Sequence, residues 1–213
     1  MTLIVLKLII IVLCAYLIGS IPTGWIIVKL MTGKDIRKIG SGSTGATNVK
    51  RVLGTKWFFI VMLLDALKGF LPVWITVNHF DFYSFVDSNT NTFHNIHGLS
   101  PAAAALAIVI GHSKSVFLDF TGGKSAASGI GTLIALSAPA GLLAALIWGV
   151  ITYFTKYVSA GSIIAVTMSV ILMQAFSGND YYVMYAALCA VFVIIRHKDN
   201  IIRLIKGAEN KVR

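Results

Sequence analysis

Long apolar stretches alternate with short polar segments along the whole chain. The apolar stretches include Leu3 to Ile18, Trp57 to Leu64, Pro101 to Ile110 and Tyr181 to Ile195. With their flanking residues, most of them extend to the ~20 residues that an α-helix needs to cross the hydrocarbon core of a bilayer. The pattern predicts an all-α fold, a polytopic bundle of transmembrane helices.

The first apolar stretch does not end at Ile18 but continues, with small residues and Pro22 inside it, as far as Met31. A run of this length is too long for the hydrophobic region of a signal peptide, and no small-residue cleavage site stands out. We therefore interpret it as a helix of the mature protein, whose Gly and Ser residues suit close helix contact.

The distribution of charge predicts the orientation. One loop contains Lys34, Arg37, Lys38, Lys50, Arg51 and Lys56, whereas the next, His79 to Ser100, contains two Asp and no Lys or Arg. Because basic residues favour cytoplasmic loops, the first loop is expected inside and the second outside, which puts the N-terminus outside. The basic C-terminal tail is expected to be cytoplasmic by the same rule.

The number of spans follows from this orientation. The apolar segment from Ser125 to Thr155 must be a hairpin of two short helices, because only an even number of crossings from there returns the tail to the cytoplasm. Pro139 and Gly141 supply the helix break, which we expect between Ser137 and Gly141. The prediction is about seven helices in one domain over residues 1–213, with every unusual polar segment on the cytoplasmic side.

Composition supports a membrane protein. Apolar residues make up 57% and charged residues 12% of the chain, with a mean hydropathy of +0.83, outside the range of soluble domains. The net charge of +10 is spread between apolar runs, so positive-inside orientation explains it and no nucleic-acid partner is expected. Cys14 and Cys189 lie far apart in apolar spans and indicate neither a disulfide nor a metal site.

Two polar segments carry candidate chemistry. Residues 39–49, rich in Gly, Ser and Thr, precede Arg51; backbone N–H groups and hydroxyls there could surround an oxyanion while Arg51 binds a phosphate through two hydrogen bonds. A flexible linker has the same composition. In the second segment, Gly122 and Gly123 precede Lys124 at a helix N-terminus, which favours an anion; a lysine at the membrane interface is the alternative.

Weaker candidates face the same side: Ser159, Ser162, His197 and Asn200. Hydroxyls, amides, Arg and Lys gathered without matching carboxylates favour a phosphate ligand. His112 could act as a base, but a lone histidine near a helix end more often makes a local hydrogen bond. Asp65 and Lys68, three residues apart in an apolar helix, are interpreted as a structural pair.

Four motifs, in order, span nearly the whole chain: Gly19-Ser-Ile-Pro-Thr-Gly; Gly40-Ser-Gly-Ser-Thr-Gly-Ala-Thr-Asn-Val; Gly111-His with Phe117 and Phe120-Thr-Gly-Gly-Lys; and His197-Lys-Asp-Asn-Ile-Ile-Arg-Leu with Gly207 and Glu209. With them the chain resembles the acyl-phosphate-dependent glycerol-3-phosphate acyltransferases, multi-pass enzymes of the bacterial cell (inner) membrane in phospholipid synthesis. It differs from the usual family pattern at Ser43 (Asn in the family), Ser115 (Pro) and Ser125 (Gly).

The resemblance implies transfer of a fatty acyl group from acyl phosphate to the sn-1 hydroxyl of glycerol 3-phosphate, giving lysophosphatidic acid and inorganic phosphate. It implies no metal, and no cofactor or obligate protein partner is expected. Because acyl phosphate is already an activated donor, no acyl-enzyme is needed. The active site is expected on the cytoplasmic side, in contact with membrane lipid. Arg51 and Lys124 would stabilise charge during catalysis. The substrate-binding residues would be Ser41, Thr47, Asn48, Gly122, Gly123, Ser162, His197 and Asn200.

Other classes of protein remain as alternatives. A transporter of organic anions also uses glycine-lined basic sites, but its polar site should lie near mid-membrane. Acyltransferases with a His-x4-Asp pair do not fit, because none of the five histidines has Asp five positions on. A noncatalytic membrane assembly protein would need no phosphate-binding loops.

Overall fold

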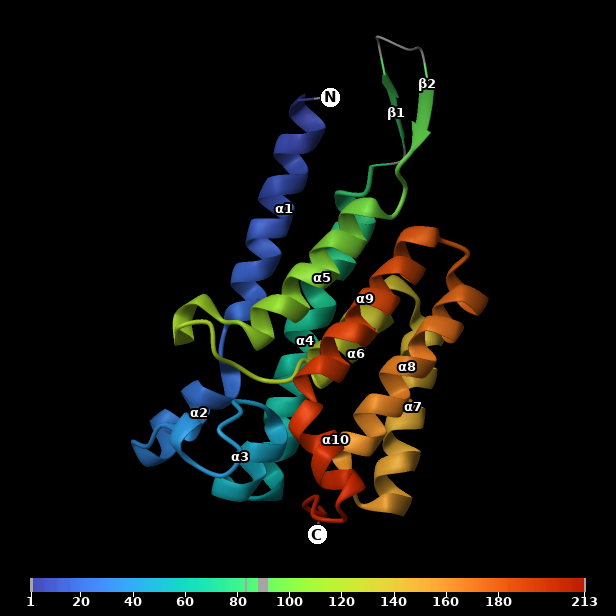
Figure 1. Ribbon diagram of the computed structural model, residues 1–213. Coiled ribbons are helices and arrows are strands. Elements are labelled where there is room, and N and C mark those ends of the chain that lie inside the picture. The colour runs from blue at the N-terminus through green and yellow to red at the C-terminus, as the bar shows by residue number, and fades with distance from the viewer. Residues whose placement is uncertain (1, 83, 88–91, 213) are drawn as a thin grey trace.

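The computed structural model describes residues 2–82, 84–87 and 92–212. The described chain folds into α-helices with two short 3₁₀ helices and one β-hairpin (Figure 1). The elements are α1 (Thr2–Ser20), α2 (Thr23–Thr32), η1 (Ile36–Lys38), α3 (Ala46–Leu53), α4 (Thr55–His79), β1 (Ser84–Asp87), β2 (Thr92–Asn95), α5 (Leu99–Ser113), η2 (Val116–Leu118), α6 (Ala126–Leu136), α7 (Ala138–Thr155), α8 (Val158–Ser177), α9 (Asp180–Arg196) and α10 (Lys198–Ile205).

Each of the seven predicted helical segments contains a helix, and the predicted hairpin breaks at Ser137, between α6 and α7. Other predictions were wrong in detail. The first helix is interrupted before Thr23, where Pro22 lacks the N–H of a regular turn. α5 ends at Ser113, and the segment from His79 to Ser100, predicted only as an external loop, contains an antiparallel hairpin.

Length separates the helices into two groups. Among the described residues, four helical segments are long and apolar enough to cross a membrane (Leu3–Thr32, Thr55–His79, Ala138–Thr155 and Val158–Ser177), and α9 with α10, bent by 62°, is a fifth if counted as one span. α6 has only 11 residues, about 16 Å at 1.5 Å per residue, which is too short to cross the bilayer alone. It packs against α4, α7, α8 and α9.

Glycines allow the closest helix pairs. A Cβ at Gly69 of α4 would collide with the carbonyl oxygen of Ser128 on α6, and one at Gly131 of α6 with that of Ala66 on α4. Where α1 and α5 cross, a Cβ at Gly19 of α1 would likewise collide with the backbone of α5, and one at Gly111 of α5 with the backbone of α1. Small residues at such points let backbones approach within a membrane, so the glycines of two of the sequence motifs serve packing.

The two ends of the bundle differ. In Figure 1 the start of α1 and the hairpin lie at one end, whereas α2, α3, α10 and the C-terminus lie at the other, hereafter the α3 end. A small core of Val28, Ile36, Val49 and Val61 joins α2, η1 and α3 to α4 at this end. Residues 23–53, the α2–α3 unit, are thus packed as one body on α4.

Candidate active site

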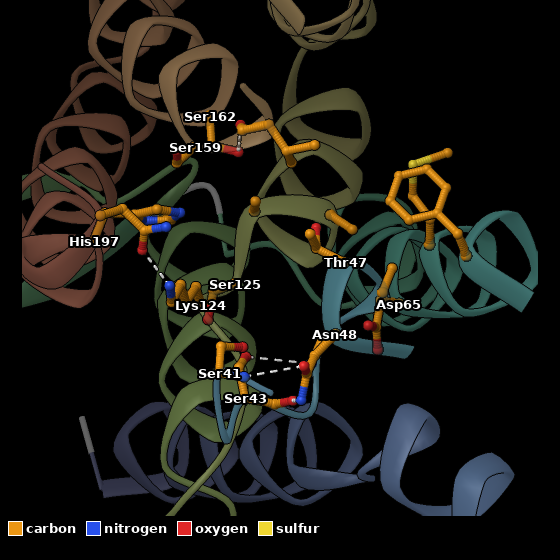
Figure 2. Close-up of a pocket in the computed structure, with 18 of the residues that line it drawn as sticks. Ser41, Ser43, Thr47, Asn48, Asp65, Lys124, Ser125, Ser159, Ser162 and His197 are labelled. Atoms are coloured by element: carbon orange, nitrogen blue, oxygen red, sulfur yellow. Dashed lines mark hydrogen bonds between the residues drawn. The ribbon is translucent and has the colours of Figure 1, made fainter. Parts of the chain in front are cut away.

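A cavity of about 280 Å³ opens among α3, α4, α6, α7, α8 and the C-terminal segment. Figure 2 shows Ser159, Ser162 and His197 on one side of it and Ser41, Ser43 and Asn48 on another, with Lys124 between them. The remaining wall is apolar and consists mainly of Phe58, Met62, Leu63, Ile130, Ala145 and Trp148. The cavity therefore joins a polar region to an apolar one.

Eight of the ten residues predicted for the site line this cavity: Ser41, Thr47, Asn48, Arg51, Lys124, Ser162, His197 and Asn200. They come from four segments far apart in the sequence. Sequence analysis named the lining residue Ser159 only as a weaker candidate, and it did not assign Arg203, Glu209, Asp65 and His112 to substrate. A carboxylate within an apolar helix could have indicated a functional role for Asp65. We interpreted it as structural because it can pair with Lys68.

Gly122 and Gly123 are not among the residues that line the cavity. The N–H of Gly123 donates to the carbonyl oxygen of His112 at 3.0 Å, and its own carbonyl accepts from Ser113 Oγ at 2.8 Å. A Cβ on Gly122 would collide with the backbone of His112, and one on Gly123 with the imidazole of His112. The structure therefore gives the two glycines a packing role against the end of α5, which fixes the chain just before Lys124.

The Gly- and Ser-rich segment is more ordered than a linker, because its second half forms α3. Asn48, which is 1% exposed, fastens the first half to this helix. Its Oδ1 accepts from the N–H of Ser41 at 3.1 Å, and its Nδ2 donates to the carbonyl oxygens of Ile39 and Ser43, each at 2.9 Å. The amide is occupied by the loop, so Asn48 shapes the loop that presents Ser41.

Replacing Asn48 by alanine is expected to destabilise the protein by about 1–3 kcal/mol, the cost of leaving buried polar groups without partners. The KM for glycerol 3-phosphate should rise by roughly tenfold, since 1.4 kcal/mol of lost binding corresponds to that factor. Thermal unfolding in detergent and steady-state kinetics measure both. The control is Asn78→Ala, which removes one exposed bond to the carbonyl of Trp74; equal stability of the two variants would contradict this role.

A second polar network surrounds Lys124. Its ammonium donates to Oδ1 of Asn200, whose Nδ2 donates to Glu209 Oε1 at 2.6 Å. Glu209 also accepts from Ser159 Oγ at 2.9 Å and from Arg203 Nε at 2.7 Å. Although partial burial opposes ionisation of Glu209, these three donors hold its pKa below the ordinary value. Glu209 offsets the charge of Arg203, so the ion pair as a whole adds little net charge to the cavity.

Arg51 and Lys124 are the lysine and arginine side chains of the cavity lining that make no ion pair within the described residues. Among the described residues Arg51 makes no ion pair with a carboxylate, and both side chains line the cavity. Ser162 donates to the carbonyl oxygen of Val158 at 2.9 Å. His197 Nδ1 lies 2.8 Å from the carbonyl oxygen of Val193 and donates to it, since a carbonyl only accepts. A neutral His197 thus keeps Nε2 as an acceptor.

The activity is expected to fall as the pH rises through about 8. Burial, and then the positive charge of Arg203, lower the pKa of Lys124 from 10.5 to about 8. Lys124 is cationic below this pKa and neutral above it, so kcat/KM should drop about tenfold per pH unit on the alkaline side. In Lys124→Arg the side chain stays charged, and its pH–rate profile should lack this limb; an unchanged limb would refute the assignment.

Comparisons with known proteins agree with this geometry. A family model described as glycerol-3-phosphate acyltransferase matches residues 9–207. The chain belongs to the glycerol-3-phosphate acyltransferase family. Glycerol-3-phosphate acyltransferase 2 of Thermotoga maritima is 43% identical over 197 residues, 92% of each chain. Glycerol-3-phosphate acyltransferase of Nostoc sp. is 41% identical over 205 residues, which cover 95% of this chain and 90% of that relative.

Two solved structures of PlsY (YgiH), described as an integral membrane glycerol 3-phosphate acyltransferase, share the fold. The glycerol 3-phosphate form matches with a TM-score of 0.85 and 35% identity, covering 97% of this chain and 96% of that one. The lysophosphatidic acid form matches with a TM-score of 0.81 and 33% identity. The protein is therefore a multi-pass membrane acyltransferase, with an all-helical membrane bundle as predicted.

In the acyltransferase, the three serines expected to differ from the family pattern make local hydrogen bonds. Ser125 has a left-handed backbone (φ 61°), which favours glycine, and its Oγ donates to the carbonyl oxygen of Val109 at 2.7 Å. Ser115 Oγ donates to the carbonyl oxygen of Ser20 at 2.6 Å, linking η2 to the end of α1. Ser43 Oγ accepts from the N–H of Gly45, so all three serines stabilise the local chain.

Proposed function

We propose that the protein transfers a fatty acyl group from acyl phosphate to the sn-1 hydroxyl of glycerol 3-phosphate. The observation that carries the proposal is a single cavity in which Arg51 and Lys124 face a polar region adjoining the apolar wall of Phe58, Met62 and Trp148. A phosphate and a fatty chain belong to the same donor molecule, and such a cavity offers both a matching environment.

The transfer is direct. The sn-1 oxygen of glycerol 3-phosphate attacks the acyl carbonyl carbon and forms the ester bond, while the bond from that carbon to the phosphate oxygen breaks. The phosphate leaves with the electron pair, and a substrate phosphate oxygen takes the hydroxyl proton. Arg51 and Lys124 stabilise the charge on the phosphate groups, and Ser41, Thr47, Ser162, His197 and Asn200 orient the substrates.

The hydroxyl groups of the cavity favour direct attack over an acyl-enzyme. Ser159 donates to Glu209 and Ser162 to a helix carbonyl, and within the described residues no cavity serine donates to a histidine nitrogen. A serine nucleophile needs such a base within hydrogen-bond reach. The two cysteines do not line the cavity. An acyl phosphate, already activated, does not require a protein nucleophile.

The decisive experiment supplies purified protein with palmitoyl phosphate, with and without glycerol 3-phosphate, and with palmitoyl-CoA as the alternative donor. Inorganic phosphate and lysophosphatidic acid should appear in equal amounts, and only when both palmitoyl phosphate and glycerol 3-phosphate are present. If lysophosphatidic acid formed with palmitoyl-CoA and not with palmitoyl phosphate, acyl phosphate would not be the donor. No product from either donor, in protein with a sharp unfolding transition, would refute the function.

We also propose that the α3 end faces the cytoplasm of a bacterial cell membrane, because the basic loops lie there. Single-cysteine variants test this in a Cys14→Ala, Cys189→Ala background. A membrane-impermeant maleimide should label Lys206→Cys, at the exposed end of α10, only after the membrane is permeabilised. Labelling in intact cells stripped of their wall would show that the α3 end faces outward, opposite to the proposed orientation.

A further inference from the structure

Asp65 occupies an unusual place for a carboxylate. It lies within the apolar membrane helix α4, is 1% exposed, and lines the cavity. Its Oδ1 accepts from the hydroxyl of Thr23 at 2.5 Å and lies 2.9 Å from the ammonium of Lys68. Charged groups are costly within a membrane, and a purely structural pair of Asp65 and Lys68 would require neither Thr23 nor the cavity.

On one side Asp65 contacts the α2–α3 unit. Thr23 is the first residue of α2, directly after the interruption of the first helix, and Lys68 Nζ donates to the carbonyl oxygen of Ile21 at 2.7 Å in the same interruption. The next residue, Gly24, packs so closely on the carbonyl oxygen of Thr44 that a Cβ would collide with it. The unit also carries Arg51 on α3. Asp65 therefore fixes the point from which this unit leaves the bundle.

On the other side Asp65 faces His112, whose Nδ1 lies 3.6 Å from Oδ1 and has no hydrogen-bond partner among the described residues. The opposite edge of the imidazole, at Nε2, packs against Gly123. Gly123 directly precedes Lys124. A chain of contacts thus leads from Asp65 through His112 to the backbone that supports the ammonium of Lys124.

We propose that Asp65 is a positioning residue that sets the separation of Arg51 and Lys124, acting through Thr23 on one side and His112 on the other. The proposal rests on the phosphate-binding function proposed above. The reaction rate depends strongly on how the bound groups are positioned, since a misplacement of about 1 Å lowers the rate on the order of 100-fold. The motif Gly19-Ser-Ile-Pro-Thr-Gly then has a function: it interrupts the first helix so that Thr23 reaches Asp65.

The primary variant is Thr23→Val, which keeps the side-chain shape and removes the hydroxyl that donates to Asp65. Its matched control is Thr76→Val, on the same helix as Asp65 but away from the cavity. The buried hydroxyl of Thr76 donates to the carbonyl oxygen of Pro72, with a hydrogen-bond length of 2.8 Å. Both substitutions remove one hydrogen bond and should lower the unfolding temperature by similar amounts. Only Thr23→Val should lower kcat/KM for palmitoyl phosphate, by roughly 10- to 100-fold.

A second variant, Asp65→Asn with Lys68→Met, removes both charges together, so that neither is left buried alone. Release of His112 should expose Lys124 to water and move the alkaline limb of the pH–rate profile upward from about 8. The charged groups around Lys124, namely Arg196, Asp199, Arg203 and Glu209, are unchanged. Thr76→Val should leave the alkaline limb in place. A shift of the limb in the double variant alone could not be explained by a general loss of stability.

Calorimetric titration with glycerol 3-phosphate provides a measurement that needs no turnover. The affinity of Thr23→Val should be at least tenfold below that of the unsubstituted protein and of Thr76→Val. Wild-type kinetics and affinity in Thr23→Val would overturn the positioning role, even if the double variant fails to fold. Unsubstituted protein that binds glycerol 3-phosphate but makes no lysophosphatidic acid would refute the proposed reaction, while the affinity comparison still decides the role of Asp65.

Discussion

Replacement of Lys124 by alanine is expected to lower kcat by about 10²- to 10³-fold, the usual cost of removing one group that stabilises charge in a transition state. The leaving phosphate gains negative charge as its bond to the acyl carbon breaks. The half-buried ammonium of Lys124, oriented by its bond to Asn200, is placed to offset that charge. Because the charge develops mainly in the transition state, KM should change less than kcat.

Two matched variants make this expectation specific. Lys114→Ala removes an exposed lysine near the end of α5 that does not line the cavity, and it should retain near-normal turnover. Lys124→Arg keeps a charge but changes the shape of the donor, so its rate should lie between those of the alanine variant and the unsubstituted enzyme. If Lys124→Ala turned over palmitoyl phosphate as fast as Lys114→Ala, the role of Lys124 in stabilising the phosphate would be wrong.

Local sequence patterns were sufficient for the long helices. Apolar runs predicted the long segments, and Pro139 with Gly141 predicted the break at Ser137, because both effects act over a few neighbouring residues. α3 was not predicted. Its residues read as the end of a Gly- and Ser-rich loop, and the helix is held by burial of Val49 against Val28, Ile36 and Val61 from other elements. That packing does not exist in the local sequence.

The site, like the fold, could be predicted from the sequence only in part. Charge and hydroxyl content made Arg51, Lys124 and their neighbours candidates, since these residue types bind phosphate, and the structure places them around one cavity. The sequence did not separate glycines that approach a ligand from glycines that pack against the protein itself, and in the structure Gly122 and Gly123 pack against His112 at the end of α5. The contacts of Asp65 join residues 23, 65 and 112, so only the folded chain reveals them.

Arg51 is expected to depend on its shape as well as its charge. A guanidinium can donate two parallel hydrogen bonds to one phosphate, whereas an ammonium acts as a point charge. Hydrogen bonds to charged groups contribute about 1.5–3 kcal/mol, so Arg51→Ala should lower kcat/KM by roughly 10- to 100-fold. Arg51→Lys should recover only part of this loss.

The comparison of Arg51→Lys with Arg51→Ala is informative because Arg51 is exposed at the cavity and has no carboxylate partner among the described residues. Its removal therefore leaves no buried charge unpaired, and the unfolding temperature should stay within a few degrees of that of Lys56→Ala, a neighbouring exposed cation outside the cavity. Full activity in Arg51→Lys would show that only positive charge is required there. Full activity in Arg51→Ala would leave Lys124 as the sole cation of the reaction and would contradict a site that binds phosphate from both sides.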